Sequence, residues 1–199
     1  MIGKLRVAGK ILLVAAYTGP MMLAQSIALR TGWWSDRWIP QLWHRCTLKV
    51  MGVRVRTVGE PARGGRVMMA SNHVSWSDIP VLGSITGVHF IAKAEIASWP
   101  IMGTFARLQR SVFVERERRR ASPEQAKEIA TRLSNGDPMV LFAEGTTGDG
   151  NRVLPFKSTL FAAAKLAMND SQETVMVQPV AIAYLARRGL RLDRMERRE

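Results

Sequence analysis

The residues best suited to chemistry are His73 and Asp78, which lie five positions apart in the polar stretch 70–78. An apolar run at 67–70 precedes them, so the sequence predicts a buried strand that ends in a turn and enters a short helix. Side chains at that point project from the carboxyl end of the strand, where open α/β sheets bind ligands. If the Asp78 carboxylate accepts a hydrogen bond from one ring nitrogen of His73, the other nitrogen becomes an acceptor that can remove a proton from a hydroxyl.

Spacing alone leaves a purely structural explanation equally open. Ser75 or Ser77 could cap a helix, and Asp78 in the first turn would interact favourably with the helix dipole. His73 would then be a polar surface residue. The rest of the sequence has to separate the two interpretations.

The composition is that of one basic domain without an internal disulfide. The chain has 199 residues, 47% of them hydrophobic, which is enough for a substantial core. Lysine and arginine number 29 against 16 acidic residues, a net charge of +13 that favours anionic partners such as lipid, acidic carrier proteins or nucleic acid. Cys46 is the only cysteine, and the three histidines show no metal-ligand spacing. We therefore expect a metal-free site in a reducing compartment.

The N-terminal segment is typical of a membrane anchor. Residues 11–29 contain no charge, and their number is close to the ~20 that span a bilayer core. Basic residues flank the segment on both sides, at Lys10 and Arg30. Because Gly19-Pro20 lies at its midpoint, a bent helix in the interface competes with a straight span. A cleaved signal peptide is the third interpretation, although the apolar stretch is long for one.

Four of the six tryptophans follow this segment, close to basic side chains: Trp33, Trp34, Trp38 and Trp43. Amphipathic rings beside cations are typical of a membrane interface. A tryptophan-rich core helix is the alternative, and aromatic rings can also stack nucleic acid bases, although no nucleic-acid motif accompanies these. We favour the membrane interpretation and assign residues 1–50 to a membrane-anchoring helical segment.

Short strands and helices alternate beyond residue 52. A period-two pattern predicts a strand at 53–58, in hairpin-like pairing with a buried strand at 66–70. Further strands are predicted at 88–92, 111–114, 138–143 and 174–182, and helices at about 95–108, 123–135 and 158–168. The run at 138–143 is almost purely apolar, which is typical of a buried, parallel strand.

Polar residues follow two of these predicted strands. Arg116 comes just after the strand at 111–114, where it could hold a phosphate or carboxylate or simply begin a solvated charge run. The strand at 138–143 ends in Glu144-Gly145-Thr146. Glycine lets backbone N–H groups approach an anionic ligand, and Glu144 and Thr146 can bond ligand hydroxyls. Taken alone, such a loop is commoner without a function.

Four motifs together resemble, in order and spacing, the blocks of the glycerolipid acyltransferases, the family of 1-acylglycerol-3-phosphate acyltransferase. They cover residues 50–185, and each falls at the end of a predicted strand. The motifs are Asn72-His73 with Asp78 (His, four residues, Asp), Phe113-Val114-Glu115-Arg116, Phe142-Ala143-Glu144-Gly145-Thr146 and Val177-Gln178-Pro179-Val180. The resemblance implies an α/β acyltransferase domain at 51–199, with a mixed, mostly parallel sheet flanked by helices, behind an N-terminal membrane-embedded or interfacial helical segment at 1–50.

The resemblance also implies an O-acyltransferase of phospholipid biosynthesis at the cytoplasmic face of the inner membrane. His73 is then the general base that deprotonates the acceptor hydroxyl for attack on an acyl thioester, oriented by Asp78 and without an acyl-enzyme. The residues implied in substrate binding are Asn72, Arg116, Glu144, Gly145 and Thr146. No metal or cofactor is implied. The donor is acyl-CoA or acyl carrier protein, the other partners are membrane lipids and a lysolipid acceptor, and no nucleic acid is expected.

Departures from the family pattern bear on the acceptor. Ala143 and Thr147 replace the usual proline and arginine of the third block, and Arg110-Ser111 stands where the second block normally carries glycine. We expect Lys157 to replace the missing arginine and 1-acylglycerol-3-phosphate to be the acceptor. Lyso-ornithine lipid, the acceptor of related bacterial enzymes, is the alternative, and a non-catalytic basic membrane-surface or nucleic-acid-binding protein is a remote one. Family members usually extend past the last strand, so the chain is expected to be short at its C-terminus.

Overall fold

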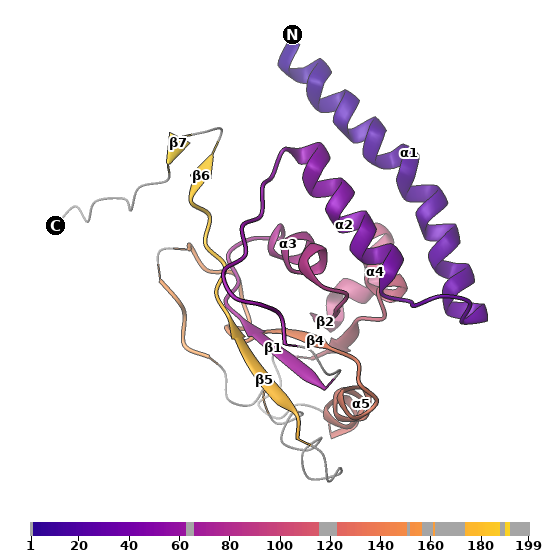
Figure 1. Cartoon of the computed structure of the whole chain (residues 1–199), viewed down its shortest axis with the longest axis vertical. Helices are drawn as coiled ribbons and strands as arrows, with labels where there is room; N and C mark the ends of the chain where they lie inside the picture. Colours follow the sequence, from indigo (N-terminus) through magenta and orange to yellow (C-terminus); the bar gives the residue numbers. More distant parts are fainter. Residues whose placement is uncertain are drawn as a thin grey trace, which may run out of the picture.

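Two helices open the chain and lie side by side along the outside of the molecule. The computed structural model describes residues 2–62, 66–115, 123–150, 152–156, 161, 174–187 and 190–191. Helix α1 (Ile2–Thr31) is followed after a short turn by α2 (Trp38–Met51), which lies between α1 and the rest of the domain (Figure 1). Gly52, with a φ of 80°, ends α2 in the left-handed conformation that glycine adopts readily. The predicted N-terminal helical segment is therefore a helical pair.

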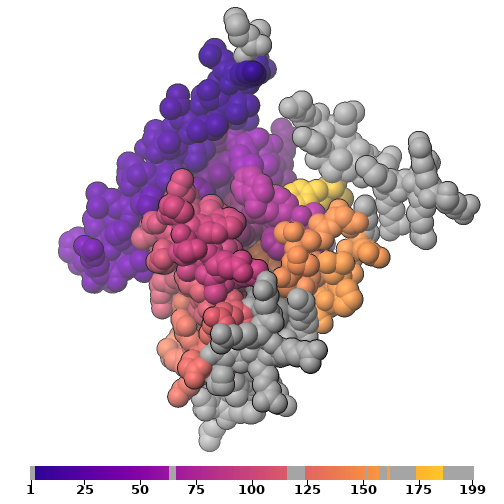
Figure 2. Space-filling view, turned by 180° about the vertical axis from the view of Figure 1, so that it is seen from behind, coloured from indigo at the N-terminus to yellow at the C-terminus, as the bar shows by residue number. Residues whose placement is uncertain are grey.

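Helix α1 has the length and composition of a helix that could cross a membrane, and most of its surface faces outward. An 18-residue stretch within residues 3–31 has a mean hydropathy of 1.5, and Leu5 and Leu12 are 78% and 70% exposed. Pro20 lies inside the helix without ending it. Figure 2 shows α1 along the edge of the molecule, with its N-terminal end projecting beyond the domain. The predicted apolar N-terminal helix is confirmed, and the choice between a span and an interfacial position stays a prediction.

The tryptophans that follow α1 divide between the surface and the interior. Trp33 and Trp38 are mostly exposed, as the membrane-interface interpretation requires. Trp43 instead packs its ring on Phe105 and donates its indole N–H to the Thr18 hydroxyl at 2.9 Å. The interpretation as core residues therefore holds for Trp43, and the membrane-interface interpretation stays a prediction for Trp33 and Trp38.

The centre of the domain is a five-stranded parallel sheet with the strand order β3-β2-β4-β1-β5. The strands are β1 (Val67–Ser71), β2 (His89–Lys93), β3 (Val112–Val114), β4 (Met139–Phe142) and β5 (Met176–Val180). β1 pairs with β4 in the register Ala70 to Leu141, and with β5 in the register Ser71 to Val180. The α/β fold predicted from the resemblance is confirmed, with all five strands of this sheet parallel. A separate two-stranded antiparallel pair is formed by β6 (Ala186–Arg187) and β7 (Leu190–Arg191).

Both faces of the sheet are covered, because its central strands are apolar on both sides. Met68, Met139 and Leu141 pack with α5 (Pro123–Ser134) on one face. Met69, Val140 and Phe142 pack with Leu82 of α3 (Asp78–Ile85) on the other. This two-sided burial explains why β1 and β4 are nearly continuous apolar runs. α5 falls where the sequence predicts a helix, and the helix predicted at 158–168 lies almost entirely outside the described residues.

The predicted strand at 53–58 and its hairpin with β1 are wrong. Residues 53–58 form no strand, and all of them except Val53 are exposed. The alternation of valine and arginine therefore reflects an extended connection and buries no face. β1 has no free edge for a hairpin partner, since β4 and β5 occupy both of its sides.

The helix predicted at 95–108 is divided in two at Trp99. A 3-10 helix, η1 (Ala94–Ser98), is followed by α4 (Pro100–Leu108). Proline disfavours the helical conformation of the residue before it, and Trp99 accordingly has an extended backbone with a ψ of 127°. Pro100 then occupies the first turn of α4, where its missing N–H costs nothing.

The connections of the sheet place a crevice at the carboxyl ends of β1 and β4. From β1 the chain leaves through α3 toward β2, and from β4 it leaves in the opposite direction toward β5. Such a switch in direction opens a crevice between neighbouring strand ends, which is where open α/β sheets bind ligands. The loop carrying His73 follows β1, and the loop starting at Glu144 follows β4.

Candidate active site

His73 and Asp78 form a hydrogen-bonded pair at the end of β1. The His73 Nδ1 atom lies 2.8 Å from Asp78 Oδ2. Asp78 is fully buried as the first residue of α3, whereas the His73 side chain keeps 15% of its surface exposed. The contact predicted from the spacing of the two residues is thus present. His73 is open enough to meet a substrate, and Asp78 is not.

The Asp78 carboxylate accepts hydrogen bonds on both of its oxygens. Oδ2 accepts the backbone N–H groups of Val74 at 2.6 Å and Ser75 at 2.9 Å, in addition to His73 Nδ1. Oδ1 accepts the hydroxyl of Tyr184 at 2.6 Å. Burial works to raise the pKa of Asp78, but the hydrogen bonds, that of His73 foremost, outweigh it and hold the pKa below its ordinary value.

An ionised Asp78 fixes the tautomer of His73. Because the carboxylate can only accept, the proton in the 2.8 Å contact must reside on His73 Nδ1. The Nε2 atom of a neutral His73 is then the acceptor nitrogen, which is the form that can take a proton from a hydroxyl. The pair can therefore act as an oriented general base.

The ring and backbone of His73 are held by residues from the end of β4. Its ring stacks on Phe142, with centroids 4.0 Å apart and planes inclined by 20°. Its backbone N–H donates to Glu144 Oε2 at 2.9 Å, and its carbonyl accepts the N–H of Gly148 at 2.7 Å. The other Glu144 oxygen accepts the N–H of Leu154 at 2.8 Å. Glu144 thus joins the His73 loop to the loop that follows β4.

The remaining residues predicted in the third block are placed less specifically. Gly145 has a φ of 73°, in the left-handed region that glycine adopts without strain, and it lies directly after β4. Thr146 and Thr147 are exposed at the start of the same loop. Gly150 approaches Val74 so closely that a Cβ there would meet a Val74 methyl group at 2.9 Å. The glycines of this loop therefore allow it to pack against the His73 turn.

Asn72 and Tyr184 connect this site to the segment after β5. The Asn72 amide donates to the Ile182 carbonyl at 3.0 Å and accepts the Ile182 N–H at 2.7 Å. Two residues further on, the Tyr184 hydroxyl reaches Asp78. Substrate binding by Asn72 stays a prediction, and the structure adds a contact with backbone. Tyr184 was not among the residues predicted from the sequence, because it lies 106 positions from Asp78 and belongs to none of the motifs.

Two predicted substrate-binding residues, Arg116 and Lys157, lie outside the described residues. Their roles remain predictions. In the described part of the chain, the second block ends at Glu115, at the carboxyl end of β3.

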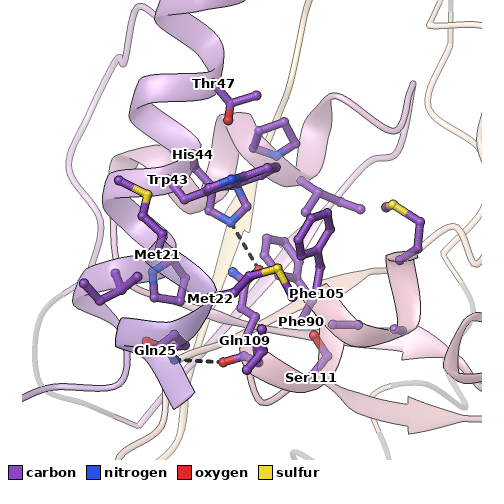
Figure 3. A pocket seen from close by; sticks show the side chains of 18 of the residues that line it. Met21, Met22, Gln25, Trp43, His44, Thr47, Phe90, Phe105, Gln109 and Ser111 are labelled. Carbon is purple, nitrogen blue, oxygen red and sulfur yellow. Dashed lines mark hydrogen bonds between the residues drawn. The ribbon is translucent and has the colours of Figure 1, made fainter. Parts of the chain in front are cut away.

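An apolar cavity of about 220 Å³ lies between the N-terminal helices on one side and α3, α4 and β2 on the other, and neither His73 nor Asp78 is among its lining residues (Figure 3). Trp76, three residues after His73, lines it, as does Phe90, whose ring stacks parallel to Phe142 at 6.2 Å. The far wall comes from α1, α2 and α4, with Met22, Trp43 and Phe105 among its residues. Some buried polar atoms at its wall bond to protein, as in the 3.1 Å contact of His44 Nε2 with Gln109 Oε1 and the bond from Gln25 Nε2 to the Leu108 carbonyl at 2.8 Å. Among the described residues, the other polar atoms of these two side chains, His44 Nδ1 and Gln25 Oε1, have no partner. The cavity suits an alkyl chain.

Residues 52–183 match the family model described as Acyltransferase, and this stretch includes the whole dyad. The chain belongs to the acyltransferase family. The family resemblance deduced from the four motifs is confirmed, and with it the prediction of an enzyme.

Two relatives of this chain are named for the lipid that they acylate. Lyso-ornithine lipid O-acyltransferase of Brucella abortus is 52% identical over 84% of this chain and 62% of its own length. The protein of the same name in Rhizobium meliloti is 44% identical over 99% of this chain and 68% of its own length. The chain thus spans about two thirds of these relatives. Among solved structures, the 1-acyl-sn-glycerophosphate acyltransferase PlsC of Thermotoga maritima matches 90% of this chain and 75% of its own, with a TM-score of 0.64 and 18% identity. That match shows the fold.

Proposed function

We propose that this chain is a lyso-ornithine lipid O-acyltransferase, which esterifies the free hydroxyl of lyso-ornithine lipid with the acyl group of a thioester. The observation that supports this most is that relatives at 52% and 44% identity both bear that name. The PlsC structure, at 18% identity, supports the fold alone. The relatives therefore favour the alternative acceptor of the sequence analysis over 1-acylglycerol-3-phosphate.

The third block supports the same acceptor. Thr147 stands where the family usually has an arginine. It is exposed on the loop that follows β4 and packs against the His73 turn. A phosphate dianion needs charge-assisted partners, whereas a zwitterionic headgroup carries its own cation and is repelled by an added one. The absence of an arginine at this position therefore suits a zwitterionic lysolipid.

The dyad geometry supports a direct transfer of the acyl group from the thioester to the acceptor hydroxyl, without an acyl-enzyme. In the proposed reaction, His73 Nε2 takes the proton of the acceptor hydroxyl as the hydroxyl oxygen bonds to the thioester carbonyl carbon. The tetrahedral adduct then collapses, the carbon–sulfur bond breaks, and the departing thiolate receives the proton from His73. The buried, ionised Asp78 stabilises the imidazolium between these two steps. The products are an ester and a free thiol, and His73 returns to its starting state.

The apolar cavity supports a place for an acyl chain next to His73. Phe90 lines it and stacks on Phe142, which stacks on His73, and α1 and α2 form its far side. A chain entering from a membrane around α1 would meet an apolar wall up to the reacting carbon. We accordingly retain the cytoplasmic face of the inner membrane as the proposed location, and acyl-CoA or acyl carrier protein as the proposed donor.

The experiment is an acyl-transfer assay on membranes that contain the full chain, with lyso-ornithine lipid and lysophosphatidic acid as acceptors side by side. We expect ester formation on lyso-ornithine lipid and little on lysophosphatidic acid. His73→Ala should reduce the rate by at least about 100-fold, since general bases contribute roughly 10²–10⁴-fold. Thr147→Arg should depress use of lyso-ornithine lipid, because the added cation would repel the cationic group of a zwitterionic headgroup.

The outcomes test the identity of the acceptor and the role of the dyad separately. Transfer to lysophosphatidic acid alone would refute the acceptor and leave the acyltransferase standing. A His73→Ala variant as active as the wild type on either lipid would refute the proposed role of the dyad.

A further inference from the structure

Tyr184 makes a contact with the dyad that the motifs do not include. Its hydroxyl donates to Asp78 Oδ1 at 2.6 Å, on the side of the carboxylate away from His73. The same hydroxyl lies 2.6 Å from Ser77 Oγ. Because the Tyr184 proton is directed to Asp78, a hydrogen bond in this second contact requires the Ser77 hydroxyl to donate, in place of its 3.2 Å bond to Ser75 Oγ. Tyr184 therefore stands in a chain of hydrogen bonds that ends on the carboxylate.

The two carboxylate oxygens of Asp78 accept different numbers of the described hydrogen bonds. Oδ2 is held by His73 Nδ1 and by two backbone N–H groups, all from the turn that precedes α3. The donor described for Oδ1 is Tyr184, which reaches it from a distant part of the chain. A carboxylate with no exposed surface is costly when one oxygen lacks a donor. The phenol thus completes the solvation of a charge that water cannot reach.

The phenol remains a donor over the whole working range of pH. Burial, followed by the hydrogen bond to ionised Asp78, raises the pKa of Tyr184 to about 12. The hydrogen bond from Tyr184 is in turn among those that lower the pKa of Asp78. The contact is therefore a neutral donor facing a carboxylate, which is a charge-assisted hydrogen bond.

We propose that Tyr184 is a positioning residue of the acyltransferase dyad, acting on His73 through Asp78. By holding Oδ1, the phenol fixes the plane of the carboxylate so that Oδ2 stays directed at His73 Nδ1. It also keeps the negative charge in place that stabilises the imidazolium formed during transfer. The inference rests on the proposed role of His73 as general base and does not depend on which lysolipid is the acceptor.

Asn72 supplies the geometry that brings Tyr184 to this place. The parallel pairing of β1 with β5 ends at Ser71 and Val180. The Asn72 side chain then continues the pairing by bonding both the N–H and the carbonyl of Ile182. Ile182 and Tyr184 are both half-buried and alternate with the exposed Ala183 and Leu185, so their side chains face the same side of the segment. In this inference Asn72 positions the segment, and the segment positions Tyr184.

The test is Tyr184→Phe in the full chain, assayed on whichever lysolipid the wild type acylates. We expect kcat to fall about ten- to a hundred-fold, the loss typical of a hydrogen bond to a buried charge, with both KM values unchanged. The acid limb of the kcat/KM profile should move to higher pH. Without the donor from Tyr184, the pKa of Asp78 should rise, so that the carboxylate that orients His73 is protonated at a higher pH.

A double-mutant cycle separates positioning from a general structural effect. In an Asp78→Ala background, Tyr184→Phe should cost little further activity, because the residue through which Tyr184 acts is already gone. The matched control is Tyr17→Phe, which removes a phenol bonded at 2.8 Å to Thr47 and should leave kcat within about two-fold. Tyr17 and Tyr184 are the two tyrosines of the chain.

The results can overturn the inference in two ways. A Tyr184→Phe variant with wild-type kcat and pH profile would refute it. So would a loss of the same size with and without Asp78, because that pattern is a structural effect on folding. If the His73→Ala variant were fully active, the proposed function itself would be refuted. The double-mutant cycle would then show no coupling in kcat between Tyr184→Phe and Asp78→Ala, because the dyad would take no part in the reaction.

Discussion

His73 depends on contacts from three separate parts of the chain. Asp78 belongs to its own turn, Glu144 and Phe142 come from the end of β4, and the donor behind Asp78 comes from the segment after β5. A ring that must deliver a proton within hydrogen-bond distance loses rate when its orientation varies. The convergence of these contacts on one ring is what the parallel sheet provides at its carboxyl edge.

The contact between His73 and Asp78 was predictable because it is local. A turn of five residues brings the two side chains together whatever the rest of the fold does. The partners of Glu144 were not predictable, since His73 is 71 positions away and the pairing of β1 with β4 is needed to join them. The sequence accordingly predicts that Glu144 matters, and the structure shows which groups it binds.

Glu144→Gln tests whether Glu144 acts on the loop or on the acceptor. Its two oxygens each accept a backbone N–H, and the residue is buried. Glutamine of the same size keeps one acceptor and turns its NH2 group toward the other N–H. The buried mismatch should cost about 1–3 kcal/mol, seen as a lower Tm, and kcat should fall with an unchanged acceptor KM.

The control for this prediction is Glu128→Gln, the same change at an exposed position on α5. It should alter neither Tm nor kcat. If Glu144 instead binds the acceptor headgroup, as the resemblance implies, Glu144→Gln would raise the acceptor KM and leave Tm unchanged.

At the scale of elements, Arg110, in the connection that leads to β3, stands where the family pattern normally has glycine, and its side chain forms ion pairs that a glycine could not form. Arg110 has a φ of 53°, a left-handed conformation in which a side chain is strained. The guanidinium is paired with Asp36, in the turn between α1 and α2, and with Asp137 at 3.3 Å, before β4. Burial works to lower the pKa of Arg110, and these two carboxylates raise it beyond its ordinary value. The position where the family normally has glycine thus ties the helical pair to the sheet.

Arg110→Gly and Arg110→Ala form a matched pair that separates strain from pairing. Both variants lose the contacts with Asp36 and Asp137, and alanine alone keeps the strained φ. We expect the glycine variant to be more stable than the alanine variant by about 1 kcal/mol, and neither to exceed the wild type. Urea unfolding in a detergent of fixed concentration measures this difference. Equal stabilities would show that the backbone relaxes at this position.

Elements were predictable where their signals are local. The proline and glycine that bound α5 mark its ends in the sequence, and Met139–Phe142 is apolar on both faces, as a central parallel strand must be. Residues 53–58 carry the alternation of a strand, but a strand also needs a partner edge, which depends on the whole topology. The division at Trp99 follows from Pro100 and was available from the sequence.

At the scale of the molecule, helix α1 contributes both to the apolar outer surface and to the wall of the apolar cavity. The exposed surface of α1 is largely apolar, with Ile11 and Leu12 among its residues, while Met21 and Met22 of the same helix line the cavity. The same helix thus presents apolar side chains both outward and to the cavity, as the proposed transfer of an acyl chain from a membrane requires. The +13 charge adds attraction to anionic headgroups but cannot replace the buried apolar area.

This arrangement predicts how the full chain leaves a membrane. High salt of ~1 M reduces the Debye length to about 3 Å and removes electrostatic attraction, but leaves apolar burial intact. We expect the protein to stay in the membrane fraction through a high-salt wash and to be released by a non-ionic detergent. The double substitution Ile11→Lys with Leu12→Lys, on the outer surface of α1, should make the protein extractable by salt. Leu185→Lys, an equally exposed leucine after β5, is the matched control and should not. Complete release of the wild type by salt would show that charge alone holds the protein, and that α1 does not enter the apolar layer.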